Sequence, residues 1–280
     1  MKTGDFSEVL TIGASGMVGA YVDFGMRPDH SALDVTDESA VMHFVMEHKP
    51  TAIIHLVGAT DMTRCESNPE YAYELNVRGT YNVALAARTV GAVMVYASTS
   101  RVFKGDKEAP YTESDFPEPY THYGRTKHIG EIIVASLVPQ HIIARTSWVF
   151  GGGPERDSKF YGKVLHQLQS DKTEIAVLND VHGSPTFAKD YIDALKDLLV
   201  KGERGTFHIA NAGVATRYEL AVAMAEHVKP QAQVRAVDRS FFPSSGTLPT
   251  NESITSTHTI LRPWQYALAE YLSLEWKIQQ

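Results

Sequence analysis

Short apolar runs alternate with helical patterns along the first two thirds of the chain, and this alternation limits the possible folds most strongly. The runs have little polar alternation, which is typical of strands buried on both faces. The predicted strands are Val9–Ile12, Ala52–Val57, Ala92–Ala97, Ile142–Thr146 and Thr206–Ala210. Helical periodicity fills Thr36–His48, Pro69–Val90 and Phe187–Val200. The sequence therefore predicts an α/β fold, a Rossmann-type doubly wound parallel sheet with helices on both faces.

The pattern changes after about residue 150, where Gly151–Gly153 predicts a flexible break between structural elements. Beyond it, Thr216 and Glu219 have the spacing of a capping box, and residues 239–258, rich in Ser, Thr and Pro, are predicted to form a loop. We predict a smaller, discontinuous C-terminal lobe, with the ligand site between it and the sheet. The predicted bounds are 1–150 plus about 185–212 for the dinucleotide-binding Rossmann domain, and 151–184 plus 213–280 for the substrate-binding lobe.

Gly13, Gly16 and Gly19 follow the first predicted strand with the spacing G-x-x-G-x-x-G and precede a predicted helix. Gly13 permits a tight turn, Gly16 lets the backbone approach a pyrophosphate, and Gly19 lets the helix pack close to the sheet. Amide groups and the helix dipole would then hold the phosphates. The loop predicts a dinucleotide site, and a plain strand–helix turn is the alternative.

The dinucleotide fingerprint ends in an acid about 20 residues downstream, and Asp34 lies in that range. The stretch Leu33–Asp37 also has the pattern of a strand end, where Asp34 would contact the adenine edge instead of the ribose. Arg27 follows a turn and could meet a 2′-phosphate, or it could be a solvated loop charge. NADP(H) is therefore the favoured cofactor, and NAD(H) stays open.

Tyr123 and Lys127 form the Y-x-x-x-K pattern of the chain, and Thr99 follows the predicted strand Ala92–Ala97 at its carboxyl end. Residues four apart share a helix face, and ligands bind at the carboxyl ends of parallel strands. These three side chains suit reduction of a ketone. A phenol can donate a proton to the developing alkoxide, an ammonium lowers the phenol pKa, and a hydroxyl adds a hydrogen bond. A surface Tyr–Lys pair is the alternative.

With these motifs, the chain resembles the extended short-chain dehydrogenase/reductases, and in particular the dTDP-4-dehydrorhamnose reductase family. The RTSW and VFG letters of Ile143–Gly151 and the GSPT of Asn179–Thr186 are specific to this family. The stretches that carry the resemblance are Leu33–Asp37, Tyr73–Thr80, Ala97–Gly105, Pro110–Asp115, Ile143–Gly151 and Asn179–Thr186. The resemblance implies reduction of the C4 ketone of a nucleotide-linked 6-deoxy-4-keto sugar by a reduced nicotinamide cofactor.

The resemblance also implies the roles of individual residues. Thr99, Tyr123 and Lys127 would be catalytic, with Tyr123 as the proton donor. Trp148 would pack on the sugar beside Ser100 and Thr99, although a core aromatic residue is the alternative for Trp148. Together with the glycine loop, the resemblance assigns the cofactor to Gly13, Ser15, Gly16, Met17, Val18, Arg27, Asp34, Val35, Gly58, Ala59, Thr60, Ala97, Tyr123 and Lys127.

Three departures from the family pattern leave other functions open. The chain has STSRVF at Ser98–Phe103 where the family has STDYVF, so a substrate-facing acid is absent at Ser100. It has His55–Gly58 in place of N-A-A-A, and Thr247–Pro249 in place of Arg-Arg-Pro. A non-catalytic NADP-binding subunit, resembling the regulatory β subunit of methionine adenosyltransferase, is one alternative. A nucleotide-sugar epimerase is the other.

Composition excludes several partners. The chain has 26 basic and 33 acidic residues, a net charge of −7, and no basic run, which disfavours nucleic acid. No long apolar stretch predicts a membrane span, and the 12 His residues lack metal-site spacing, so we expect neither membrane nor metal. The sole cysteine, Cys65, and the lack of a secretion signal in Met1–Glu8 predict a cytoplasmic protein. The expected partner is a nucleotide-sugar substrate, and a homodimer stays open.

Overall fold

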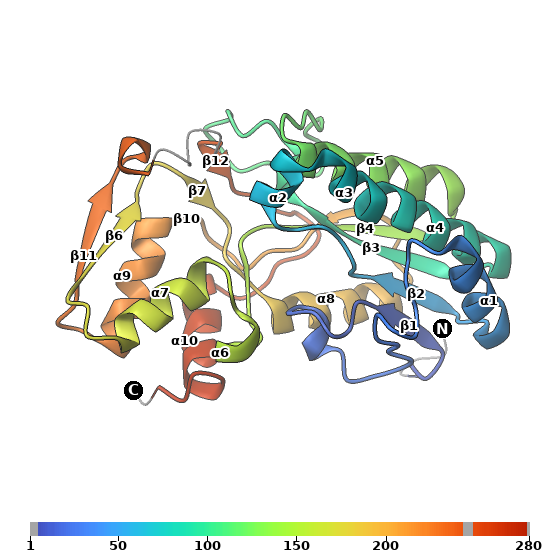
Figure 1. The fold of residues 1–280 in the computed structure, drawn as a ribbon, viewed down its shortest axis with the longest axis horizontal. Helices are drawn as coiled ribbons and strands as arrows, with labels where there is room; N and C mark the ends of the chain where they lie inside the picture. Colours follow the sequence, from blue (N-terminus) through green and yellow to red (C-terminus); the bar gives the residue numbers. More distant parts are fainter. Residues whose placement is uncertain (1–4, 243–248, 279–280) are drawn as a thin grey trace.

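The computed structural model describes residues 5–242 and 249–278, so Met1–Gly4, Thr247 and Leu248, named above, lie outside it. Within the described residues, five parallel strands form the central sheet in the order β1-β2-β3-β4-β9 (Figure 1). Their bounds are Val9–Ile12 (β1), Ala52–His55 (β2), Val93–Thr99 (β3), His141–Thr146 (β4) and Gly205–His208 (β9). The predicted α/β fold with a parallel Rossmann-type sheet is confirmed.

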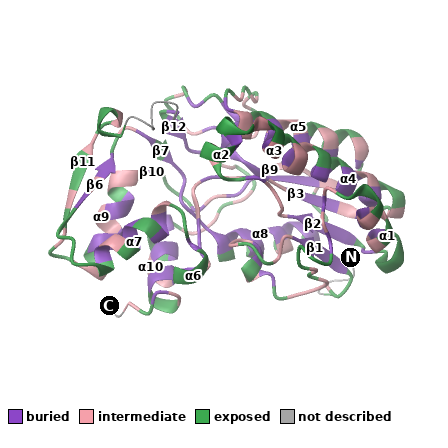
Figure 2. Ribbon diagram, in the orientation of Figure 1, coloured by how far each residue is buried: buried purple, intermediate pink, exposed green. Residues whose placement is uncertain are grey.

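Helices cover both faces of the sheet. On one face, α1 (Glu38–His48), α4 (Gly79–Val90) and α5 (His122–Leu137) pack on side chains that include Leu10, Ile53 and Met94. On the other face, α8 (Ala188–Lys201) packs on side chains that include Val9, Ile54 and Val95. Neighbouring strand residues therefore point to opposite faces and are all buried, as Figure 2 shows.

A second group of elements lies beside the sheet and has its own apolar core (Figure 1). Its helices are α6 (Gly153–Arg156), α7 (Phe160–Gln169), α9 (Arg217–Val228) and α10 (Trp264–Leu274). Its strands pair as β5 (Val149–Phe150) with β8 (Thr186–Phe187), β6 (Glu174–Leu178) with β11 (Gln233–Val237), and β7 (His182–Gly183) with both β10 (Ala215–Thr216) and β12 (Asn251–Glu252). The predicted capping box of Thr216 and Glu219 is present at the start of α9. The domain bounds themselves stay a prediction.

The glycine loop does not lead into the predicted α-helix. It leads into a short 3-10 turn, η1 (Gly19–Tyr21), after which the chain returns to the edge of the sheet at Met26. There the amide of Thr11 donates to Met26 at 2.8 Å, and the amide of Met26 donates to Val9 at 2.8 Å. A Cβ at Gly19 would overlap the oxygen of Gly13, so Gly19 packs on its own loop and not on the sheet. Because η1 is a single short turn, the dipole at this loop is smaller than that of the predicted α-helix.

The segment Pro69–Val90 is not the single predicted helix. It divides into α3 (Pro69–Tyr73), a π-helical turn η2 (Glu74–Arg78) and α4, and it is preceded by α2 (Met62–Ser67). The π turn places Asn76 in the interior, where its side chain accepts a hydrogen bond from the Ala59 amide at 2.8 Å and donates to Thr126 Oγ1 at 3.0 Å. These bonds account for the interruption of the helix.

The predicted loop 239–258 includes regular structure in its described residues, 239–242 and 249–258. The segment contains η4 (Arg239–Phe241) and β12, and β12 pairs with β7. Another 3-10 turn, η3 (Ser100–Val102), follows directly on β3, which extends through Thr99 instead of ending at Ala97. These two segments, far apart in the sequence, meet in the site described below.

We predict that Gly130→Ala destabilises the chain by about 1–3 kcal/mol, because a Cβ there would overlap the hydroxyl of Tyr96 where α5 crosses β3. Alanine is otherwise favoured over glycine in a helix by about 1 kcal/mol. Urea denaturation measures the change, with exposed Ser136→Ala on the same helix as the control, expected within about 0.5 kcal/mol of the parent. A Gly130→Ala variant as stable as that control would contradict the close contact.

Candidate active site

The ends of β3 and α5 bring the predicted catalytic residues together. Thr99 ends β3, and α5 begins one residue before Tyr123, with Thr121 as its N-cap. A Cβ at Gly124 would overlap the backbone oxygen of Arg101, so the first turn of α5 lies directly against η3. This contact brings the Thr99 side chain close enough to the Tyr123 phenol to lower its pKa. The predicted proximity of the two hydroxyl groups is thus present in the structure.

Lys127 is buried one helical turn beyond Tyr123. Its Nζ donates to the carbonyl oxygen of Ala97 at 2.6 Å and lies 4.0 Å from the centroid of the Tyr96 ring. Burial lowers the pKa of Lys127 to about 7, although the charge of Glu131 opposes this shift. The ammonium group is therefore fixed in place but easily deprotonated.

The Tyr123 phenol has a different electrostatic environment from the one that the sequence predicts. Burial raises its pKa above the usual value, and this outweighs the effects of the neighbouring Thr99 side chain and of the Arg101 charge, which both lower it. The expected lowering by Lys127 is not the dominant effect. A phenol with a raised pKa keeps its proton near neutral pH, which suits a proton donor.

A buried ion pair lies directly behind the catalytic residues. The Glu131 carboxylate accepts hydrogen bonds from Arg145 at 2.8 and 2.7 Å and from Ser98 Oγ at 2.5 Å. Burial would raise the pKa of Glu131, but the bonds from Arg145, His128 and Ser98 lower it to about 2. The pair joins α5 to β3 and β4 and so holds the helix that carries Tyr123 and Lys127.

The glycine loop presents backbone donors at the end of β1. Gly13 has a φ of +94°, and a Cβ on it would lie 3.0 Å from the amide of Val57, so the loop lies tightly against the chain that leaves β2. In the part of the chain that the structure describes, the amides of Ser15, Met17 and Val18 have no hydrogen-bond acceptor. Such unpaired amides suit phosphate oxygens.

The residues predicted for the adenosine end lie along the edge of the sheet beside β1. Arg27 directly follows Met26, is exposed, and donates through Nη1 to the oxygen of Val22 at 2.7 Å. The Asp34 carboxylate accepts hydrogen bonds from the amide and hydroxyl of Thr36 at 2.9 and 2.8 Å, and these bonds lower its pKa. Val35 is buried against α4.

The segment after β2 connects the glycine loop to the catalytic residues. A Cβ at Gly58 would lie 2.8 Å from Asn76 Oδ1 and 3.8 Å from Lys127 Nζ, so this glycine borders the catalytic lysine. Ala59 is buried, whereas Thr60 is exposed and accepts a hydrogen bond from Lys159 at 3.2 Å. Of the predicted segment, Gly58 therefore lies beside Lys127, and Thr60 lies beside Lys159.

Trp148 is held in an unusual conformation between the sheet and the lobe. Its φ is +41°, in the left-handed region that bulky residues rarely adopt. Its ring lies flat against Gly183, where a Cβ would overlap it, and 5.4 Å from the guanidinium carbon of Arg217. Trp148 is half-buried and packs against the apolar core of the lobe, so its role at the sugar stays a prediction. Ser100, predicted beside it, is buried in η3.

Sequence reasoning missed a buried ion pair at this site. Arg101 Nε and Glu252 Oε2 are 2.6 Å apart, and the two side chains are 6% and 4% exposed. Glu252 belongs to β12, in the segment predicted to be a loop, so no periodicity indicated its burial. The pair places an acid next to η3 although Ser100 itself carries none. Its charges also act on the pKa of Tyr123.

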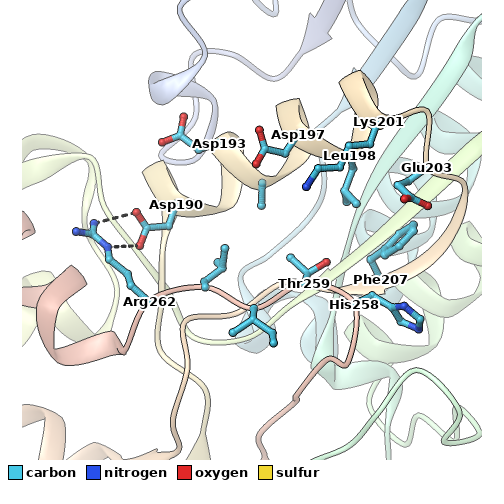
Figure 3. Close-up of a pocket in the computed structure, with 13 residues that line it drawn as sticks. Asp190, Asp193, Asp197, Leu198, Lys201, Glu203, Phe207, His258, Thr259 and Arg262 are labelled. Carbon is cyan, nitrogen blue, oxygen red and sulfur yellow. Dashed lines mark hydrogen bonds and ion pairs between the residues drawn. The ribbon is translucent and has the colours of Figure 1, made fainter.

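A cavity of about 490 Å³ lies elsewhere, between α8 and residues 258–262 (Figure 3). The 13 described residues that line it include none of the predicted site residues. Asp190 and Arg262, which point toward each other there, are already joined at 2.8 Å.

Among residues 5–242 and 249–278, no cluster of three or more His, Cys, Asp or Glu side chains could hold a metal ion. The helices in those ranges include none long and apolar enough to cross a membrane.

The sheet order, the glycine loop on β1 and the Thr–Tyr–Lys set together define an extended short-chain dehydrogenase/reductase. A family model described as the RmlD substrate binding domain matches residues 7–275. The dTDP-4-dehydrorhamnose reductase of Mycolicibacterium smegmatis is 33% identical over 279 residues, which cover 94% of this chain and 84% of that protein. The chain therefore belongs to the dTDP-4-dehydrorhamnose reductase family, and the predicted resemblance is confirmed.

Solved structures of family members are similar over nearly their whole length. The dTDP-4-dehydrorhamnose reductase of Clostridium acetobutylicum has a TM-score of 0.89 and 30% identity, covering 95% of this chain and 98% of that one. The enzyme of Bacillus anthracis, in complex with NADP, has a TM-score of 0.89 and 29% identity, covering 94% and 98%. The match extends over both the sheet and the lobe.

We predict that Glu131→Gln destabilises the chain at pH 7 by about 3 kcal/mol, because Arg145 would lose its ionic partner in the interior. The pKa of Glu131 is lowered to about 2, so the stability from its ionised form is present above the unfolded value near 4.3 and lost as pH falls through about 2. The difference from the parent should therefore shrink as pH falls.

Urea denaturation at pH 7 and pH 3 measures this difference. The exposed acid Glu226 gives the control variant Glu226→Gln, which should match the parent within about 0.5 kcal/mol at both values. If the destabilisation by Glu131→Gln were the same at pH 3 as at pH 7, the ionised carboxylate would not be its cause.

Proposed function

We propose that the chain reduces the C4 ketone of a nucleotide-linked 6-deoxy-4-keto sugar with NADPH. The observation that carries this proposal is the juxtaposition of Thr99, Tyr123 and Lys127 at the carboxyl end of β3. Membership of the dTDP-4-dehydrorhamnose reductase family and the NADP-bound relative from Bacillus anthracis support the substrate class and the cofactor. Among nucleotide-sugar ketones, dTDP-4-dehydrorhamnose is the first candidate.

The protein side chains have distinct tasks in this reaction. When bound, NADPH supplies a hydride to the ketone carbon. Tyr123 keeps its proton because burial raises its pKa, and it donates that proton to the ketone oxygen. Thr99 lies close to the phenol and would add a second hydrogen-bond donor to the ketone oxygen. Lys127, fixed on Ala97, places a positive charge beside Gly58, where it favours the anionic form of the phenol after transfer.

The cofactor residues predicted from the sequence would bind NADPH across the carboxyl ends of β1, β2 and β3. Unpaired amides at Ser15, Met17 and Val18 would hold the pyrophosphate, with Gly13 and Gly16 giving the backbone room. The adenosine end would lie at Arg27, Asp34 and Val35, and the nicotinamide end at Gly58, Ala59, Thr60, Ala97, Tyr123 and Lys127. Thr99, Ser100 and Trp148 would contact the sugar. A cytoplasmic location and a homodimer belong to the same proposal.

We predict that Tyr123→Phe lowers kcat by about 10²–10⁴-fold, because the proton donor is lost while the ring remains. The decrease in NADPH absorbance is followed with freshly generated dTDP-4-keto-6-deoxy sugar and its epimerase. The exposed Tyr266 gives the matched control Tyr266→Phe, which should keep full activity. The affinity for NADPH, measured by fluorescence, should stay within about threefold in both variants.

The same assay separates the alternatives. If the parent binds NADPH but oxidises none with any nucleotide-sugar ketone, the proposed reductase is wrong, and a regulatory NADP-binding subunit that co-purifies with a partner becomes the better interpretation. A tightly held NAD and interconversion of sugars without net oxidation would instead indicate an epimerase. Equal activity of Tyr123→Phe and the parent would exclude the proposed proton donor.

We predict that Arg27→Ala lowers the preference for NADPH over NADH by about tenfold. Arg27 lies where the chain leaves the sheet edge beside β1 and would meet the 2′-phosphate with charge-assisted hydrogen bonds. The ratio of kcat/KM for the two cofactors measures the preference. Arg88→Ala, at an exposed position of α4, removes one charge elsewhere and should leave that ratio unchanged. An unchanged ratio in Arg27→Ala would assign the preference to another residue.

A further inference from the structure

Arg217 lies between two aromatic rings of the lobe. Its guanidinium carbon is 5.4 Å from the ring centroid of Trp148 and 5.2 Å from that of Phe160. Its charge also interacts with the buried pair of Arg101 and Glu252. Trp148 is the residue proposed to pack on the sugar, so Arg217 borders the proposed sugar site from the side of α9.

Apart from the two aromatic rings, the fold gives this charge no direct partner. Within residues 5–242 and 249–278, no acceptor or acidic group lies within hydrogen-bond or ion-pair distance of the Arg217 guanidinium. Burial lowers its pKa, so the cation is partly withdrawn from water. It is also the first residue of α9, where the helix dipole disfavours a positive charge. An unpaired, desolvated cation at the wrong end of a helix lowers stability, which suggests that it binds a ligand.

Further hydrogen-bond donors surround Arg217 without partners. The indole nitrogen of Trp148 and the hydroxyl of Tyr161 are both buried. Among the described residues, neither group has a hydrogen-bond partner. Tyr161 is 2% exposed; burial and the charge of Asp157 raise its pKa, and the charge of Arg217 lowers it. Glu252 is paired with Arg101 at 2.6 Å, although its second carboxylate oxygen is buried without a partner, so Arg217 is the cation of this group without an ionic partner among the described residues. Unpaired donors beside an unpaired cation match an anion.

We propose that Arg217 binds the diphosphate of the nucleotide-sugar substrate and helps to determine specificity for such substrates. The inference rests on the proposed function, because the diphosphate is attached to the same sugar that Trp148 would cover. A guanidinium group presents its donors as a planar fork that matches two phosphate oxygens. The position between the rings of Trp148 and Phe160 restricts the guanidinium before the ligand arrives, which lowers the entropy cost of binding.

The experiment measures binding of dTDP, UDP, thymidine and inorganic pyrophosphate to the full chain saturated with NADP⁺, by titration calorimetry. Arg217→Gln should weaken dTDP, UDP and pyrophosphate by about tenfold or more, because charged hydrogen bonds are lost, and should leave the affinity for thymidine and NADP⁺ unchanged. The matched control is Arg235→Gln, which removes an exposed arginine paired with Glu174 at 2.8 Å and should change none of these affinities.

Unchanged affinity of Arg217→Gln for all three phosphate ligands would overturn the proposal. This readout does not depend on catalysis. If the parent binds the nucleoside diphosphates but reduces no nucleotide sugar, the proposed reductase function fails while the role of Arg217 is still decided by the variants. If the parent reduces the sugar and Arg217→Gln keeps its KM, only the role of Arg217 fails.

Thermal stability gives a second, independent readout. Because Arg217 has no ionic partner and loses only two cation–π contacts, Arg217→Gln should melt close to the parent's temperature. A lower melting temperature with unchanged dTDP affinity would instead assign Arg217 a purely structural role. Arg217→Lys keeps the charge and loses the fork, so it should bind dTDP several-fold more weakly than the parent. Parent-like dTDP affinity in Arg217→Lys would contradict bidentate binding, even if Arg217→Gln could not be purified.

Discussion

The buried ion pair between Glu131 and Arg145 is the interaction on which the site depends most. It joins α5 to β4, and the bond from Ser98 joins the same carboxylate to β3. Two charges in an apolar interior are tolerated only when the donors and acceptors are matched, so the pair fixes one relative position of helix and strands. Because Lys127 precedes Glu131 by one helical turn, its Nζ reaches Ala97 only in that position.

Much of the sheet and of the catalytic set could be predicted from the sequence. The sequence predicts the bounds of strand β1 because a short, mainly apolar run ends at a glycine. The proximity of Tyr123 and Lys127 follows from the helical repeat, and that of Thr99 from the rule for parallel strands. Helical spacing and the position of a residue at a strand end depend on local sequence or on sheet topology, so a single sequence is enough to predict them.

The features that escaped prediction depend on distant partners. The π turn exists because Asn76 bonds to Ala59 and Thr126, neither of which is adjacent in the sequence. The burial of Glu252 depends on Arg101, about half the chain away. The short turn after the glycine loop depends on the early return of the chain at Met26. No periodicity encodes such pairs, so only the folded arrangement reveals that an acid lies next to η3 despite its absence at Ser100.

The left-handed backbone of Trp148 has an evolutionary consequence. A bulky residue at a φ of +41° pays a steric penalty that glycine would avoid, so mutation without selection for activity should replace it. In a lineage where a reductase had become a scaffold protein, this position would be among the first to drift. The residue type at this position would therefore distinguish catalytically active members of the family from relatives that have lost enzymatic activity.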